Sequence, residues 1–158
     1  MRNQPIKTIL ARKSHLVSKY VQSKTWSRWS HVVVVDGDHV IQSVGIPPFK
    51  LILVLFGIIP NSTALGGVKR TPLDTFLKQY PDNRTVWIDG DINVARYMVD
   101  KAMYDAWGVI GVRFKYRIDC DDKMTCSKMV WLCHSGLRDT FAYRATPQSI
   151  LENSRDYE

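Results

Sequence analysis

The sequence predicts a single α+β domain, and three observations carry this prediction. Its 158 residues suit one folded domain, and 45% apolar with 23% charged residues is an ordinary globular composition. Residues 26–43, WSRWSHVVVVDGDHVIQS, read as two strands joined by a tight turn at Asp36-Gly37. The stretch DDKMTCSKMVWLCHSG reads as a short helix with Thr125 as its N-cap and Gly136 after its end. We therefore expect a central antiparallel sheet with this helix packed against it.

The hairpin would place an imidazole beside an amide. If Asp36 and Gly37 form a two-residue loop, counting outwards from the loop fixes the register. The expected pairs are Val35–Asp38, Val34–His39, Val33–Val40 and His31–Gln42. Directly opposed side chains share one face of a sheet, so His31 and Gln42 would be neighbours and His39 would point to the other face. A base with an orienting partner is half of a catalytic apparatus.

Cys126 is the candidate nucleophile that completes it. The residue falls in the first turn of the predicted helix, where unpaired N–H groups and the helix dipole favour a thiolate over a thiol. A thiolate, a histidine base and a polar orienter make up a Cys-His-polar triad. We therefore expect Cys126, His31 and Gln42 to meet in one site.

Several motifs of the chain together resemble one family. The segments WSHVVVV, DG and HVIQS, then GGVKRTPLDTFL, KYRIDCDD, TCSKMVWLC and TPQSILENS, follow the pattern of the permuted papain-fold (permuted NlpC-type) cysteine amidases of the YiiX/YebB group. The resemblance covers roughly residues 10–155. It implies a circularly permuted papain-like fold with the sheet packed against the nucleophile helix. Gln42 stands where the family usually has an acid, and Lys128 stands where Glu is common.

The resemblance also implies a chemistry. Cys126 would attack an amide or ester carbonyl, His31 would take and return the proton, and Gln42 would orient the ring. The substrates implied are amide bonds of cell-wall peptides (peptidoglycan), with lipid amides or esters as the alternative. Tyr116 resembles a tyrosine upstream of the nucleophile, which would line the substrate pocket or support the oxyanion together with Thr125 and Ser127.

The whole charge excess of +7 lies in the N-terminal segment. Residues 1–35 contain seven basic and no acidic residues, while the remaining 15 basic and 15 acidic residues cancel. Ile6, Ile9 and Leu10 begin a helically spaced apolar stripe, so residues 1–25 are predicted as a basic amphipathic helix and residues 26–158 as the papain-like domain. Such an arm either packs on the domain or binds an anionic surface such as a membrane, a cell-wall polymer or nucleic acid.

Four other segments have predicted structures. A short helix starts at Thr71-Pro72, residues 85–88 form a strand, and residues 92–107 form the longest helix, with Gly108 after its end. The apolar run from Leu51 to Phe56 is too short to cross a bilayer, and is a buried strand or, alternatively, a lid or oligomer contact.

Neither a metal nor another cofactor is expected. The carboxylates near Asp119 lack the spacing of a calcium loop, and the three cysteines lack the spacing of zinc pairs or of a disulfide framework. The composition suits a reducing compartment, so the expected location is the cytoplasm or a virus particle, without a signal peptide or a membrane-spanning helix.

Two other functional classes stay open. One is a catalytically degenerate binding or structural module, because Gln42 replaces the acid. The other is a basic nucleic-acid-binding protein, although no helix-turn-helix or RNA-binding motif supports a specific nucleic-acid partner.

Overall fold

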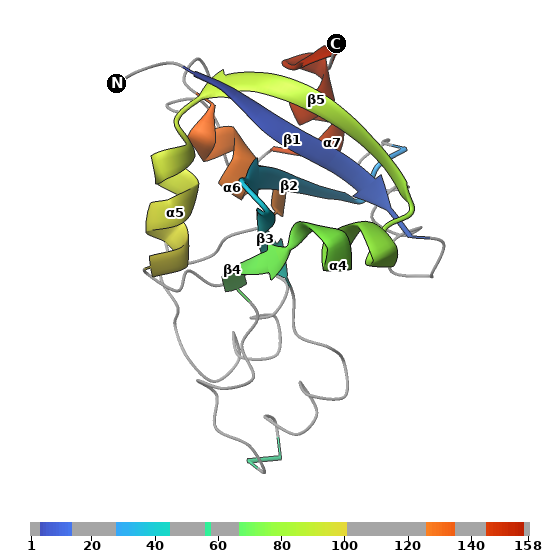
Figure 1. Ribbon diagram of the computed structural model, residues 1–158, viewed down its shortest axis with the longest axis vertical. Coiled ribbons are helices and arrows are strands. Elements are labelled where there is room, and N and C mark those ends of the chain that lie inside the picture. The colour runs from blue at the N-terminus through green and yellow to red at the C-terminus, as the bar shows by residue number, and fades with distance from the viewer. Residues whose placement is uncertain are drawn as a thin grey trace.

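The structure is a computed structural model that describes residues 4–13, 28–44, 56–57, 67–100, 126–134 and 145–156 (Figure 1). The labels below are those of Figure 1. The elements in chain order are β1 (Gln4–Arg12), β2 (His31–Asp36), β3 (His39–Val44), β4 (Gly67–Pro72), α4 (Leu73–Gln79), β5 (Asp82–Gly90), α5 (Ile92–Asp100), α6 (Cys126–Cys133), α7 (Pro147–Glu152) and β6 (Arg155–Asp156).

The strands form one open antiparallel sheet in the order β4-β3-β2-β1-β5-β6. Within the described residues, the helices that accompany this sheet extend over six to nine residues each. The predicted α+β papain-like fold of the permuted NlpC type is therefore wrong: the described residues form a six-stranded open sheet with a few short helices. No helix among them is long and apolar enough to cross a membrane.

Strand β1 is the largest departure from the sequence prediction. It lies inside the sheet, between β2 and β5, and pairs with β5 along its whole length and with β2 over residues 8–11. Ile6 and Leu10 are buried on one face, and Ile9 and Ala11 on the other. A strand buried on both faces carries apolar residues in nearly continuous runs, which also satisfy helical spacing. The helix predicted over residues 1–25 is wrong over Gln4–Arg12, and residues 14–25 lie outside the described part.

Each face of the sheet has its own core. One face packs against α5, α6 and α7, and its buried residues include Val32, Val34, Ile41, Ala95, Met98, Met129, Val130 and Ile150. The other face packs against α4, through Ile9, Ala11, Val33, Val40 and Phe76. Alternation along β2 thus sends even-numbered residues towards α6 and odd-numbered residues, His31 included, towards α4.

The β2–β3 hairpin has a register two residues away from the predicted one. Its observed pairs are Val34–Ile41, Val35–Val40 and Asp36–His39, so the loop is Gly37-Asp38 and not Asp36-Gly37. Gly37 has a φ of 64°, which glycine adopts without strain at the first loop position. A shift of two residues keeps every side chain on its predicted face, because the period of a strand is two. His31 and Gln42 still share a face, but as diagonal and not directly opposed neighbours.

Most other element predictions are confirmed where the structure describes them. The strand predicted at 85–88 lies inside β5, α4 follows Thr71-Pro72, and α5 begins at Ile92 and runs to Asp100. The rest of the predicted helix over 92–107 lies outside the described residues, as does most of the apolar run from Leu51 to Phe56. Its last residue, Phe56, is 77% exposed.

Gly90 fixes the end of α6 to the end of β5. The backbone N–H of Asp91 donates to the carbonyl oxygen of Cys133 at 2.9 Å, and Gly90 forms a bridge with His134. A Cβ atom at Gly90 would collide with that same carbonyl, so only glycine permits this approach. Because α6 also packs on β2 and β3, it crosses the two strands that carry His31 and Gln42. Its first residue, Cys126, is at the end farthest from Gly90, about 10 Å along the helix axis.

Candidate functional site

A buried hydrogen bond joins two of the predicted site residues. His31 Nε2 and Gln42 Oε1 are 2.9 Å apart, and the two residues are only 9% and 3% exposed. Gln42 Nε2 in turn donates to Thr71 Oγ1 at 2.8 Å. The predicted contact is thus present, and its catalytic role stays a prediction. Thr71 belongs to the edge strand β4, and the hairpin sequence carries no signal for it.

This network determines the protonation of the imidazole. Because the amide NH₂ of Gln42 donates to Thr71, its carbonyl oxygen faces His31. A carbonyl oxygen only accepts hydrogen bonds, so Nε2 of His31 carries the proton. In the neutral ring Nδ1 then holds the lone pair and is the nitrogen that accepts a proton.

Two aromatic residues contributed by α4 and the residue after it cover His31. The rings of Tyr80 and His31 stack with centroids 5.3 Å apart, and the ring of Phe76 lies 4.8 Å from that of Tyr80. Lys13 places its Nζ atom 4.4 Å from the centroid of the Tyr80 ring. The sequence analysis did not identify Tyr80. Its spacing of four from Phe76 was the available signal, since residues at that spacing share a helix face.

Cys126 is the first residue of α6; it is half-buried and forms no disulfide. The helix packs on the sheet face opposite to His31, which is a second difference from the predicted papain-like arrangement. Nevertheless, Cys126 interacts electrostatically with Tyr80, the residue whose ring stacks on His31. Burial raises the pKa of the Tyr80 phenol above its usual value, and the negative charge of a Cys126 thiolate raises this pKa further. Tyr80 therefore contacts the imidazole and lies within electrostatic reach of the thiol.

Of the three residues predicted to line the pocket, the structure describes one. Ser127 is buried, and its Oγ atom lies 3.9 Å from Cys126 Sγ. Tyr116 and Thr125 lie outside the described residues, as do Cys120 and the carboxylates near Asp119. Within the described part of the chain, no group of three or more His, Cys, Asp or Glu side chains is arranged to hold a metal.

The other described histidines are not part of this arrangement. His39 pairs with Asp36 and not, as predicted, with Val34, and its Nδ1 atom lies 2.6 Å from Asp38 Oδ1. This contact lowers the pKa of the exposed Asp38 carboxyl. His134 follows α6, with Nε2 3.2 Å from the carbonyl oxygen of Asn153.

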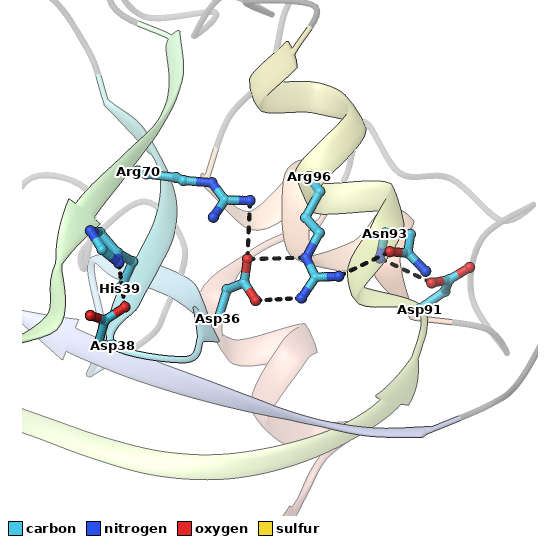
Figure 2. Close-up of polar contacts among 7 residues, drawn as sticks. All are labelled: Asp36, Asp38, His39, Arg70, Asp91, Asn93 and Arg96. Carbon is cyan, nitrogen blue, oxygen red and sulfur yellow. Dashed lines mark hydrogen bonds and ion pairs between the residues drawn. The ribbon is translucent and has the colours of Figure 1, made fainter.

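A second polar cluster lies at the turn end of the hairpin (Figure 2). Asp36 accepts two hydrogen bonds from Arg96, at 2.7 and 3.1 Å. It also forms an ion pair with Arg70 at 3.2 Å. Arg96 also donates to the Asn93 side chain at 3.2 Å. Hydrogen bonding and the charge of Arg96 hold the pKa of Asp36 below its usual value. The cluster borders a cavity of about 690 Å³ that also touches Lys7 and Trp87.

Comparison of the chain with family models, with curated proteins and with solved structures gives no match. The family that the sequence motifs resemble is therefore not identified by these comparisons. The arguments that follow depend on the geometry of the site alone.

Proposed function

We propose that this protein is a cysteine-dependent hydrolase or acyl transferase that acts on amide or ester bonds. In this proposal Cys126 is the nucleophile, His31 is the general base and acid, and Gln42 orients the imidazole. The observation that carries it is the buried chain His31–Gln42–Thr71, which orients the imidazole through its Nε2 atom. The position of Cys126 at a helix start, within electrostatic reach of Tyr80, supports the choice of nucleophile.

The reaction follows from these groups. Nδ1 of His31 takes the thiol proton, and the Cys126 sulfur forms a bond to the substrate carbonyl carbon. The backbone N–H of Cys126, at the start of a helix, is the donor for the oxygen that becomes negative. The bond from the carbonyl carbon to nitrogen or oxygen then breaks, and the imidazolium gives its proton to the leaving group. Water, or another acceptor in a transferase, attacks the thioester and releases the free thiol.

A neutral orienter changes the energetics of this mechanism. Gln42 holds the ring by a hydrogen bond but contributes no negative charge to stabilise an imidazolium. Stacking on Tyr80 and a tilted contact with Phe76 limit the movement of the ring and keep water from one of its faces. We therefore expect a base that is well oriented but less basic than one paired with a carboxylate.

The substrate and the location belong to the same proposal. Peptidoglycan amides and lipid-linked amides or esters are the candidates that the sequence resemblance suggests. Cys126 and Cys133 form no disulfide, which suits a reducing compartment such as the cytoplasm, and a virus particle formed there is compatible with this.

Selective alkylation tests the assignment of the nucleophile. At pH 6, iodoacetamide should modify Cys126 faster than Cys120 or Cys133, because Cys126 begins α6 and is the proposed partner of the His31 base. Cys133 is a good internal control, since it is fully buried and its Sγ lies 3.2 Å from the carbonyl oxygen of Met129. Peptide mapping by mass spectrometry measures the three rates.

Turnover separates an enzyme from a binding module. Wild-type protein should hydrolyse a small soluble ester or thioester, and Cys126→Ser should not. If the three thiols are labelled equally and no turnover depends on Cys126, the enzyme proposal is wrong and the catalytically degenerate binding module is favoured.

A further inference from the structure

We infer that Tyr80 is a positioning residue for the proposed reaction, and that the face of its ring stabilises the protonated His31 which the reaction creates. The inference rests on the proposed function and gives Tyr80 part of the task that a carboxylate performs in a Cys-His-acid triad. It follows from the contacts of the Tyr80 ring with the imidazole, with Phe76 and with Lys13.

The surroundings of His31 explain why such a residue matters. His31 is almost fully buried, and burial disfavours the charged form of an imidazole. The amide oxygen of Gln42 accepts a hydrogen bond from the ring but adds no negative charge, and the next group in the chain, the Thr71 hydroxyl, is also neutral. A group over the face of the ring can supply the stabilisation that the amide does not.

Tyr80 has the geometry for this contact. Its ring centroid lies 5.3 Å from that of His31, and the two planes are inclined by only 21°. The negative face of an aromatic ring attracts a cation within about 6 Å of its centroid. Phe76 makes a longer, tilted contact with His31, with centroids 6.2 Å apart. Of the two rings, Tyr80 is therefore the one that stacks on the imidazole.

The end of α4 holds the Tyr80 ring in place. The backbone N–H of Tyr80 donates to the carbonyl oxygen of Phe76 at 2.9 Å, and its carbonyl oxygen accepts from the Asn83 side chain at 2.8 Å. Phe76 is fully buried, and its ring lies 4.8 Å from that of Tyr80. The ring is thus fixed before the proton arrives, so its effect requires no rearrangement during the reaction.

Two charged groups act on the same ring. The Nζ atom of Lys13 lies 4.4 Å from the Tyr80 centroid, so this ring already attracts one cation. The charge of Lys13 opposes protonation of His31, whereas a Cys126 thiolate favours it. Burial and the charge of that thiolate raise the pKa of the Tyr80 phenol above its usual value, so the phenol stays protonated at neutral pH. Tyr80 therefore acts through the face of a neutral ring and not as a phenolate.

The pKa of His31, followed by NMR, tests the inference without any need for turnover. Tyr80→Phe keeps the aromatic face and should change this pKa by less than about 0.3 unit. Tyr80→Leu removes the face and should lower the pKa by about 0.5–1.5 units, the size of a cation–π contact. The difference should persist in about 1 M salt, where the charge of Lys13 is screened beyond about 3 Å.

A fluorinated side chain separates the charge of the face from its shape. A trifluorinated phenylalanine incorporated at position 80 keeps the ring but makes its face much less negative, so the pKa of His31 should fall below its value in Tyr80→Phe. Tyr97→Leu removes an exposed ring on α5 and should leave the titration of His31 unchanged. The inference is overturned if Tyr80→Leu or the fluorinated variant leaves the pKa of His31 unchanged or raises it, or if Tyr97→Leu lowers it equally.

Alkylation of Cys126 then connects the inference to the proposed function. If His31 takes the thiol proton, a less stable imidazolium leaves less thiolate. Iodoacetamide should therefore modify Cys126 about three- to thirtyfold more slowly at pH 6 in Tyr80→Leu than in Tyr80→Phe. A lowered pKa of His31 with unchanged alkylation supports the inference about the imidazole but overturns the proposed partnership of His31 with Cys126. An unchanged pKa, with alkylation of Cys126 that still depends on His31, overturns the inference and leaves the proposed function standing.

Discussion

The two ends of the β2–β3 hairpin carry polar clusters of opposite character. At the turn, Asp36 is a charged group surrounded by Arg70 and Arg96, and each arginine is almost half exposed. At the open end, His31 and Gln42 are buried and hydrogen-bonded to each other, and Gln42 also donates to Thr71. The first cluster ties β2 to β4 and α5 through ion pairs of one carboxylate with two guanidinium groups, and the second holds one ring in one orientation.

This difference separates a stabilising cluster from a candidate reactive one. A carboxylate with two guanidinium partners has no reason to change its protonation near neutral pH, because its pKa is lowered. An imidazole held by a neutral amide is oriented by that hydrogen bond and is not fixed by an ion pair with a carboxylate. Substitutions at the turn should therefore change stability, and those at the open end should change reactivity.

The largest effect is expected for His31→Ala. Loss of the base should lower kcat/KM for a small ester by about 100- to 10,000-fold, the usual contribution of general acid–base catalysis. It should also remove the selective alkylation of Cys126. His31→Gln, which keeps more of the side-chain volume, should show the same loss if packing is preserved. His39→Ala is the matched control on the other face of the hairpin, and an equal loss there would remove the distinction between the two histidines.

A smaller effect, on stability, is expected for Asp36→Asn. The variant should lower the free energy of unfolding by about 1–3 kcal/mol at pH 7, since charged hydrogen bonds are lost but the arginines are partly screened by water. The folded pKa of Asp36 is lowered, so its stabilisation is complete above the unfolded pKa of about 4 and is lost as the pH falls below it. Urea unfolding at pH 7 and pH 3 should show this difference shrinking in acid.

Asp38→Asn is the control for this experiment. Its side chain is 92% exposed and pairs with the neighbouring His39. Activity should be unchanged in both variants. A large loss of activity in folded Asp36→Asn would mean that the two clusters are not independent.

The smallest change is expected for Gln42→Glu. The Thr71 hydroxyl can donate as well as accept, so a carboxylate can replace the amide in the same chain of hydrogen bonds. Ester hydrolysis should stay within about threefold of wild type or increase, and the pKa of His31, followed by NMR, should rise because an anion favours the imidazolium. Gln42→Leu should lose activity by tenfold or more. An inactive but folded Gln42→Glu protein would argue against the orienting role.

The sequence predicts the hairpin and the contact between His31 and Gln42, because both follow from local alternation. The register was wrong for a non-local reason: Asp36 belongs to the ladder, where it binds Arg70 and Arg96 from later elements. Neither arginine is identifiable as a partner from the turn itself. The error did not change the predicted contact of His31 with Gln42, because a shift of two residues keeps each side chain on the same face of the sheet.

Local sequence patterns could not predict the fold class or the position of β1 in the sheet. An apolar run such as Ile6, Ile9 and Leu10 fits a helix stripe as well as a strand buried on both faces. Only its pairing with β5, some seventy residues away, decides between them. Tyr80 was missed for a similar reason, since its contact with His31 depends on how α4 returns across the sheet.

The central position of β1 has a consequence for how the chain folds. The β2–β3 pair closes over a two-residue loop, while joining Arg12 to Asp82 brings together residues 70 positions apart. Closing the long loop between β1 and β5 costs entropy before the contacts that offset this cost are formed. The hairpin should therefore form early, and β5 should join β1 late. Until then β1 exposes one row of N–H and C=O groups, and the half-built sheet is the species most prone to pair with another copy of itself.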